Sequence, residues 1–538
     1  MNGSATGGDT RWRDGLVAAA LFSAFYWLAA VHKGYHVDEF YSWVYTLRFS
    51  AGEILRMADT GIGHPPLFHL LLKASQTLFG DAMPVALRAV NFVVGLATIP
   101  VMMAVLRQHR YRSWFLWALV ISGSWLNGLV FARMYGLMLL AGFLTVWRGE
   151  AWIRSGRPVD LLWLLATVAF GMVADFNYAI LLPYAGYAAL YPTRLLKGVI
   201  AAFLALIIPL WLFLGVQYGE ISGQGDLAWS LYKLVRNGFS TVQVSVFNIL
   251  PFWFHETLVT AVVAVAGATA WGWRRARWRG EGLRSPLAGI LLLAVVVLTL
   301  SRSVLRTDLV PGRVAVLPGL AVVVLLMWAL WRWRGQVRLA DLDTRLLLSL
   351  LGAFLIVLTM TSIFWRPLVG WRFVLVLFPL VTVLVLRNLP EAALRLLAAL
   401  MALSGVLFAG SASLDSIYPA GRSADRPVVF QNTHTVATHY LTTPPERVAP
   451  LYFLDMGFFE ASCRICTMGT TAVPFAEWDA FTLVGYREYA QEHPPPSGFE
   501  LVTREEVPLS ALDRWQFRWL TPVHDRDYAV FHYRRATP

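Results

Sequence analysis

The chain has 538 residues, of which 57% are hydrophobic and only 14% charged, and its mean hydropathy is +0.56. A water-soluble protein of this size does not carry so few charged residues, so the composition predicts an integral membrane protein. The net charge of +12 would suit a nucleic-acid ligand. The basic residues nevertheless come as short clusters between apolar stretches, which argues against a nucleic-acid partner and indicates cytoplasmic loops.

Apolar windows long enough to cross a hydrocarbon core of about 30 Å recur along the first 412 residues. They lie at 16–33, 84–106, 114–131, 134–148, 160–175, 177–192, 198–217, 256–273, 286–304, 312–331, 345–364, 370–387 and 392–412. We therefore expect an all-α polytopic domain of about thirteen transmembrane helices over residues 1–412. No small-residue cleavage site follows the first window, which is expected to stay in the membrane.

The basic clusters give the chain an orientation, because alternate loops carry arginines and the positive-inside rule assigns such loops to the cytoplasm. The clusters are Arg11 and Arg13; Arg107, Arg110 and Arg112; Arg148, Arg154 and Arg157; Arg194 and Lys197; Arg274, Arg275, Arg277, Arg279 and Arg284; Arg332, Arg334 and Arg338; Arg387 and Arg395. With an odd number of spans, the first long loop (34–83) and the tail (413–538) then face outward. In a bacterium, this is a multi-pass inner-membrane protein with both segments in the periplasm.

The two outward segments differ in pattern. In the first loop, residues 41–57 and 65–79 carry apolar side chains at helical spacing, which predicts two amphipathic helices lying on the membrane. The tail has short strand-like runs at 428–430, 481–484 and 528–531, which predict a small soluble α/β domain. Its Cys463 and Cys466 are the only cysteines of the chain. Outside the cytoplasm, a disulfide between them is favoured over a free pair or a redox site.

Asp38 and Glu39 follow the first apolar window by a few residues, at the membrane surface. Carboxylates at such a position cost desolvation energy, so they are functional candidates. Each can act as a base, a metal ligand or the partner of a cation; the alternative is an ion pair that fixes the loop to the span. His64 precedes two prolines that open the second amphipathic helix, which suits an anion site. The alternative for His64 is a surface histidine at a turn.

A divalent metal ion is an open alternative in the same loop. His36, Asp38, Glu39, His64 and His69 supply suitable ligand types, but no tight ligand spacing demands a metal ion. His36 and Glu39 are its first candidate ligands, and no other cofactor is indicated.

Further polar residues lie where outward-facing spans meet. Arg133 and Tyr135 separate two spans, and Asp175 separates the next two, so these side chains are expected to line a cavity there. The remaining outward cations are Arg302, Arg306, Arg313, Arg366 and Arg372. Such an excess of arginines over carboxylates is expected where a phosphate-bearing ligand binds. For Arg313 and Arg372, the alternative is an arginine that anchors the end of a span.

The order of these motifs resembles the membrane-embedded GT-C glycosyltransferases, in particular the protein O-mannosyltransferase-like group that includes the bacterial lipid A aminoarabinose transferase. The likeness covers about residues 12–412. It rests on Asp38-Glu39 followed by Tyr41, on Gly-His-Pro-Pro-Leu at 63–67, on Leu87-Arg88 with Asn91, and on Ala-Arg-Met-Tyr-Gly-Leu at 132–137. At 175–178 the chain reads Asp-Phe-Asn-Tyr where relatives carry a Thr-His-Tyr-like segment, so no metal or acceptor contact is carried over there.

The resemblance implies a donor in which a sugar is joined through one phosphate to a polyprenol. It also implies an acceptor whose hydroxyl attacks the anomeric carbon, with inversion, while Asp38 acts as the base or positions the acceptor. His64 and the five outward arginines compete as contacts of the donor phosphate. Phosphate leaves without a general acid, so one carboxylate and several cations suffice.

The acceptor of such an enzyme would be lipid A, a polysaccharide, another lipid or a protein. The enzyme would also contact the membrane lipids around it. Two other functions stay open. One is a ligase that transfers a preassembled glycan from a polyprenyl diphosphate. The other is a lipid or glycan transporter, for which charged or broken helices near mid-membrane are expected.

Overall fold

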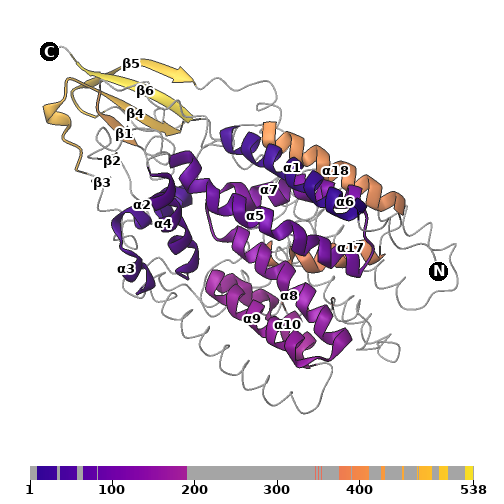
Figure 1. Ribbon diagram of the computed structural model, residues 1–538. Coiled ribbons are helices and arrows are strands. Elements are labelled where there is room, and N and C mark those ends of the chain that lie inside the picture. Colours follow the sequence, from indigo (N-terminus) through magenta and orange to yellow (C-terminus); the bar gives the residue numbers. More distant parts are fainter. Residues whose placement is uncertain are drawn as a thin grey trace, which may run out of the picture. The chain divides into compact units, whose positions relative to one another are not determined.

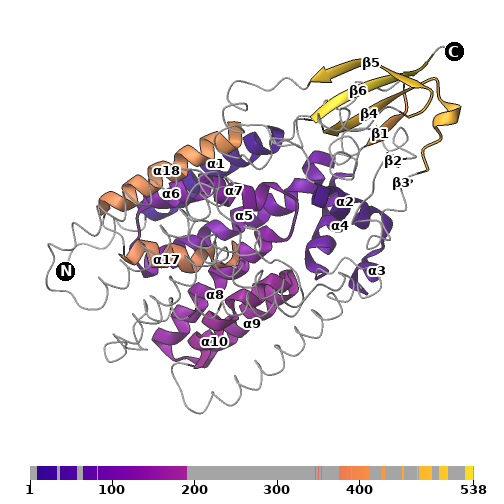
Figure 2. The ribbon, with the colours of Figure 1, turned by 180° about the vertical axis from the view of Figure 1, so that it is seen from behind.

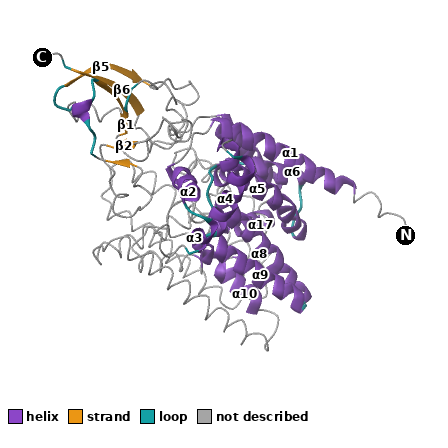
Figure 3. Cartoon of the chain, turned by 60° about the vertical axis from the view of Figure 1, so that its left-hand side comes forward, coloured by secondary structure: helices purple, strands orange, loops and turns teal. Residues whose placement is uncertain are grey.

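The computed structural model describes residues 9–32, 37–56, 65–80, 83–190, 346, 349, 353, 375–388, 391–410, 426–430, 451–453, 469–470, 472–486, 496–506 and 528–536. Over these residues, the chain is mostly helical, and its strands all belong to the C-terminal segment (Figures 1 and 3). It divides into two compact units. Unit 1 comprises Met1–Ala24, Val94–Gly128 and Met134–Val406, and unit 2 comprises Phe25–Val93, Leu129–Arg133 and Leu407–Pro538.

The described residues form helices that overlap the predicted apolar windows or, between residues 37 and 79, lie in the first loop. They are α1 (Asp9–His32), α2 (Val37–Arg48), α3 (Ala51–Leu55), α4 (Leu67–Phe79), α5 (Met83–Gln108), α6 (Ser113–Ile121), α7 (Gly123–Val130), α8 (Tyr135–Ser155), α9 (Pro158–Ala174), α10 (Leu182–Leu190), α17 (Phe378–Asn388) and α18 (Glu391–Gly410), with 3₁₀ turns η2 (Phe176–Leu181) and η4 (Leu375–Leu377).

Two of these helices, α1 and α5, are long and apolar enough to cross a membrane, and the bent pair α6 and α7 would make a third span. Such helices indicate a membrane protein. The predicted windows 198–217, 256–273, 286–304 and 312–331 lie outside the described residues, so the total of about thirteen spans stays a prediction.

The window 114–131, predicted as one straight span, is broken at Ser122, where α6 and α7 meet with a bend of 46°. Ser122 has an extended backbone conformation, and its Oγ accepts a hydrogen bond from the backbone N–H of Trp125 at 3.3 Å. A serine in this position caps the helix that follows. The backbone N–H of Gly123 donates to Ser404 Oγ of α18 at 2.9 Å, which satisfies a second group freed by the break.

The core of unit 1 gathers around the buried Trp125 of α7. Its indole lies edge-on to the rings of Phe22 and Phe143, with centroids 6.5 and 6.2 Å away, and 6.2 Å from the Phe378 ring. These four side chains come from α1, α7, α8 and α17. Helices α8, α9 and α10 pack side by side in the same unit (Figure 2).

Unit 2 contains the helices of the first loop. The two predicted amphipathic helices are present, but the first is divided at Ser50, which caps α3 in a reciprocal pair with Glu53. Hydrogen bonds from the hydroxyl and backbone N–H of Ser50 hold the pKa of Glu53 below its usual range. The cap formed by Ser50 and Glu53 starts a new helix, so the segment 41–57 forms two helices rather than one.

The tail forms a six-stranded mixed sheet with strand order β3-β2-β1-β4-β6-β5. The strands are β1 (Val428–Phe430), β2 (Leu451–Phe453), β3 (Gly469–Thr470), β4 (Ala480–Tyr486), β5 (Phe499–Glu506) and β6 (Tyr528–Arg535). All three predicted runs are therefore strands, namely β1, β4 and β6. Strands β1 to β4 pair in parallel, whereas β6 runs antiparallel between β4 and β5. Cys463 and Cys466 lie outside the described residues.

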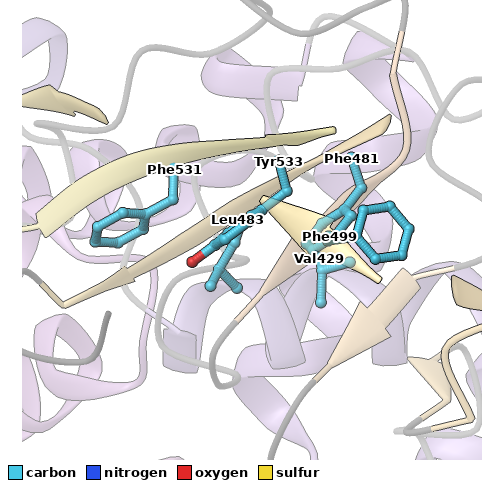
Figure 4. Close-up of a cluster of buried hydrophobic side chains, with 6 residues drawn as sticks. All are labelled: Val429, Phe481, Leu483, Phe499, Phe531 and Tyr533. Carbon is cyan, nitrogen blue, oxygen red and sulfur yellow. The ribbon is translucent and has the colours of Figure 1, made fainter. Parts of the chain in front are cut away.

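One face of this sheet carries an aromatic core (Figure 4). The ring of Phe481 stacks on that of Tyr533 with centroids 4.8 Å apart and meets that of Phe499 at 5.0 Å. Thr482 and Val484, which alternate with Phe481 along β4, are also buried. Because neighbouring residues of a strand point to opposite faces, both faces of β4 are covered, as is usual for a parallel sheet.

The packing of α18 against α6 predicts the effect of one added methyl group. A Cβ on Gly405 would overlap the carbonyl oxygen of Ile121, so Gly405→Ala forces the two helices apart. Overpacking of this kind costs about 1 to 3 kcal/mol or more, and we expect a lower apparent Tm in detergent micelles. Gly410→Ala, in the same helix, is the control, because its Cβ would have none of the described atoms within 4 Å. Equal Tm values for the two variants would contradict this packing.

Candidate active site

Glu39 lies in the first turn of α2 and is fully buried. One of its carboxylate oxygens, Oε1, accepts a hydrogen bond of 2.8 Å from the backbone N–H of Ala132. The same oxygen lies 3.5 Å from Nε of Arg88, whose side chain is 1% exposed. Glu39 therefore connects the first loop to α5 and to the turn between α7 and α8.

Helix α5 presents a second polar side chain one turn after Arg88. The amide nitrogen of Asn91 donates to the carbonyl oxygens of Phe131 and Arg133, at 2.7 and 2.9 Å. Both Arg88 and Asn91 are buried. Residues three apart lie on the same face of a helix, so α5 reaches Glu39 and the turn 131–133 with one face.

These contacts provide hydrogen-bond partners for a stretch of irregular backbone. Residues 131–133 are not helical, so their N–H and C=O groups lack the partners that a helix supplies. In apolar surroundings an unsatisfied backbone group costs several kcal/mol, and irregular backbone persists only where the protein provides other partners. Here the partners are Glu39 and Asn91. The hydroxyl of the buried Tyr26 donates to the carbonyl of Arg88 at 2.7 Å, which joins α1 to the same set.

We call Tyr26, Glu39, Ser42, Arg88, Asn91 and the turn 131–133 the Glu39 cluster, and all of it belongs to unit 2. Its last member is Ser42, whose Oγ accepts a hydrogen bond of 3.0 Å from Nη1 of Arg133. Arg133 was predicted to line a cavity, and the structure places its side chain, which is 9% exposed, against α2. Both Glu39 and Ser42 thus fix α2 to the turn.

The buried side of α2 combines polar with aromatic side chains, because Trp43 and Tyr45 are buried as well. Glu39, Ser42 and Thr46 follow one another at helical spacing, and none is more than 1% exposed. Thr46 Oγ1 accepts a hydrogen bond of 2.8 Å from Nε2 of Gln76, and its carbonyl oxygen accepts one of 2.7 Å from the Lys73 ammonium group. Both partners are in α4, so hydrogen bonds hold the two loop helices together.

Helix α4 likewise buries polar residues together with the apolar residues Phe68 and Leu72. His69, Ser75 and Gln76 are buried, whereas Leu78 and Phe79 are 79% and 45% exposed. Exposed apolar side chains are expected on a helix whose outer face meets lipid. That the loop helices lie on the membrane stays a prediction.

Several predicted site residues lie outside what the structure describes. For Asp38 and Tyr41, only the backbone is described, and it belongs to α2. The other predicted residues of this kind are His36, His64, Arg302, Arg306, Arg313, Arg366 and Arg372. Their roles stay predictions.

Tyr135 and Asp175 were predicted to line the same cavity, and both belong to unit 1. Tyr135 is the first residue of α8 and is buried. Asp175 caps η2, where its Oδ1 accepts hydrogen bonds of 2.7 and 2.6 Å from the backbone and side-chain nitrogens of Asn177. A local capping role therefore accounts for the Asp-Phe-Asn-Tyr sequence at this turn.

The structure gives no support for a metal ion among the described residues, where no three His, Cys, Asp or Glu side chains gather in a way that could hold one. His69, a candidate ligand, is buried and lies edge-on to the ring of Tyr45, with centroids 5.0 Å apart. Glu39, the other described candidate, is engaged by Arg88 and Ala132.

Sequence reasoning missed Tyr26, Ser42 and Thr46, and it gave Arg88 and Asn91 no role beyond the motif. One local signal was present, because Glu39, Ser42 and Thr46 repeat at spacings of three and four residues. That spacing indicates a polar stripe on one helix face. The partners of the stripe could not be identified in this way, since they come from α4, α5 and the turn after α7.

The ion pair predicts a defined pattern of stabilities. Arg88→Met removes the guanidinium that pairs with the buried carboxylate of Glu39, and breaking a buried pair in this way costs about 3 to 5 kcal/mol. Adding Glu39→Gln removes the stranded charge, so the double variant should have a higher apparent Tm in detergent than Arg88→Met alone. Arg534→Met is the control, because the pair it breaks, with Glu500, is largely exposed. A double variant that is no more stable than Arg88→Met would contradict the coupling.

Comparison with known proteins adds no evidence for or against the motifs. No family model, no curated protein and no solved structure matches the chain. The likeness to the GT-C glycosyltransferases therefore rests on the quoted residues, and the function has to be argued from the chemistry of the Glu39 cluster and of the residues next to it.

Proposed function

We propose that the chain is an inverting glycosyltransferase that moves a sugar from a polyprenyl-phosphate donor to a hydroxyl or phosphate of a glycolipid, polysaccharide or protein. One observation carries the proposal. The motifs at Asp38-Glu39, Arg88-x-x-Asn91 and Ala132-Arg133 are far apart in sequence, yet Glu39, Arg88 and Ala132 are in direct contact. Motifs that define one site are expected to converge in this way.

The two adjacent carboxylates have different roles in this proposal. Glu39 is buried and engaged by a guanidinium and a backbone N–H, so it is a positioning residue that fixes the start of α2. Asp38 is the neighbouring residue in that first turn and acts as the base. A fixed backbone next to the base reduces the entropy lost when the acceptor and the base are brought into line.

The proposed reaction is a direct displacement. The acceptor oxygen attacks the anomeric carbon, the bond from that carbon to the phosphate oxygen breaks, and its electron pair leaves with the polyprenyl phosphate. Asp38 accepts the proton of the acceptor hydroxyl. His64 and the arginines at 302, 306, 313, 366 and 372 are the candidates for stabilising the negative charge on the leaving phosphate.

The proposed orientation puts this chemistry on the outer face of the inner membrane. Three segments predicted to be cytoplasmic are in contact in unit 1, because Asp14 of α1 accepts a hydrogen bond from Tyr111, and Arg110 pairs with Glu391 of α18. Their meeting supports the assignment of the arginine clusters to one side of the membrane. The first loop then lies on the other side.

One observation favours the transporter alternative, namely the broken pair of helices α6 and α7. Transporters bind substrates at such breaks, where backbone groups are left for the ligand. Here the break carries Ser122, Gly123 and Ser124 and no charged residue. Its Gly123 N–H donates to Ser404 of α18, so this backbone group already has a partner within the protein.

The assignment of Asp38 is tested by Asp38→Asn in purified full-length protein. We expect normal membrane insertion and an unchanged Tm, with release of polyprenyl phosphate from polyprenyl-phosphate sugars at least about a hundredfold slower, the scale of losing a catalytic base.

Glu39→Gln should lower the Tm and the release rate together, because it weakens the support of α2. Glu477→Gln is the control, an exposed glutamate of the tail, and should leave both unchanged. Release by Asp38→Asn at the wild-type rate would remove Asp38 from the mechanism.

A further inference from the structure

A second charged cluster lies in unit 1, where three arginines share one carboxylate. Nη2 of Arg110 lies 2.8 Å from Oε2 of Glu391, while Nε of Arg112 and Nε of Arg395 lie 3.4 and 3.8 Å from Oε1. Arg110 and Arg112 come from the segment between α5 and α6, and the other two residues from the first turns of α18. We call these four residues the Glu391 cluster.

The Glu391 cluster has more positive than negative charge. Among these four residues, one carboxylate faces three guanidinium groups, and Asp14 accepts a hydrogen bond of 2.7 Å from the Tyr111 hydroxyl. Arg107 adds a further cation, with its guanidinium 5.8 Å from the centre of the Tyr111 ring. Like charges held this close repel one another, and an added anion relieves the repulsion.

The arginines of the Glu391 cluster are accessible to a ligand. The side chains of Arg110 and Arg112 are 34% and 42% exposed, and that of Arg395 is 71% exposed. The shared carboxylate fixes their positions, so less side-chain entropy is lost when they bind an anion. A guanidinium donates two parallel hydrogen bonds to a phosphate, which makes phosphate the anion that this group suits best.

Apolar side chains continue from the Glu391 cluster along the neighbouring helices. On α18, Leu396, Leu403 and Val406 are exposed, and on α1, Leu16 and Val17 are exposed. Helix α6 contacts both of these helices, because Trp117 donates to the carbonyl oxygen of Asp14 in α1 and Ile121 packs against Gly405 in α18. A ligand with a phosphate on the arginines and alkyl chains against these side chains would match both surfaces.

We infer that the Glu391 cluster is a binding site for the headgroup of an anionic phospholipid, whose acyl chains lie along α18 and α1. The phosphate neutralises the positive charge of the arginines that Glu391 does not neutralise. Basic pockets between membrane helices bind anionic headgroups in this way. The inference does not depend on the proposed function, because the Glu391 cluster contains no residue assigned to the transfer reaction.

The test measures lipid binding to delipidated, purified full-length protein by native mass spectrometry, with phosphatidylglycerol and phosphatidylcholine of equal chain length. We expect phosphatidylglycerol to bind preferentially. Each arginine near a membrane surface contributes about fivefold in affinity for anionic lipid, so Arg110→Gln with Arg112→Gln should weaken its binding about 25-fold. Arg157→Gln is the control, because Arg157 is already paired one to one with Asp160.

Two further variants separate a lipid site from a purely structural ion-pair network. Arg395→Gln removes the most exposed arginine and should weaken binding about fivefold without loss of folded protein. Glu391→Gln removes the competing carboxylate and should bind phosphatidylglycerol at least as tightly as the wild type.

Equal binding of the two lipids, or loss of phosphatidylglycerol binding in Glu391→Gln alongside the arginine variants, would overturn the inference. Displacement of the lipid by millimolar inorganic phosphate would also overturn it, since the ligand would then be a free phosphate.

Discussion

The described part of unit 2 depends on one constraint, the need to satisfy irregular backbone in apolar surroundings. The turn 131–133 interrupts the passage from α7 to α8, and helical hydrogen bonds end there. Glu39 and Asn91 supply the missing partners. Because Glu39 is charged and buried, it requires Arg88 in turn. A single turn thereby fixes the position of α2 against α5.

Buried polar side chains also join the two loop helices α2 and α4. In contact with lipid, burying apolar side chains gains little, and buried hydrogen bonds hold helices together instead. Ser42, Thr46 and Gln76 provide these bonds. Leucines and a phenylalanine then remain on the outside of α3 and α4. The loop is therefore suited to lie at a membrane surface while it holds a residue such as Asp38 in place.

The sequence was sufficient to predict the elements whose signal is local. The ends of α1, α5 and α9 agree with the apolar windows to within several residues, and β1, β4 and β6 agree with the strand-like runs. The break at Ser122 could not be predicted, because a hydropathy window averages over a single serine. What makes the break stable is Ser404, which is far away in sequence.

The sequence was sufficient to locate the candidate site but not to assign a role to each of its residues. Asp38 and Glu39 are equivalent in a sequence, since either could be a base, a metal ligand or an ion-pair partner. Only the contacts of Glu39 with Arg88 and Ala132 distinguish a positioning carboxylate from its neighbour. These contacts depend on how α5 and the turn after α7 pack, and packing has no local signature.

The central claim is that the Glu39 cluster supports transfer from a lipid-linked sugar phosphate. The most direct measurement supplies the purified wild-type protein with a panel of polyprenyl-phosphate sugars and, separately, with the matching nucleotide sugars, and follows the release of each leaving group. The account predicts release of polyprenyl phosphate from at least one lipid-linked sugar and no release of nucleotide. Consumption of nucleotide sugars with the lipid-linked sugars left intact would contradict it.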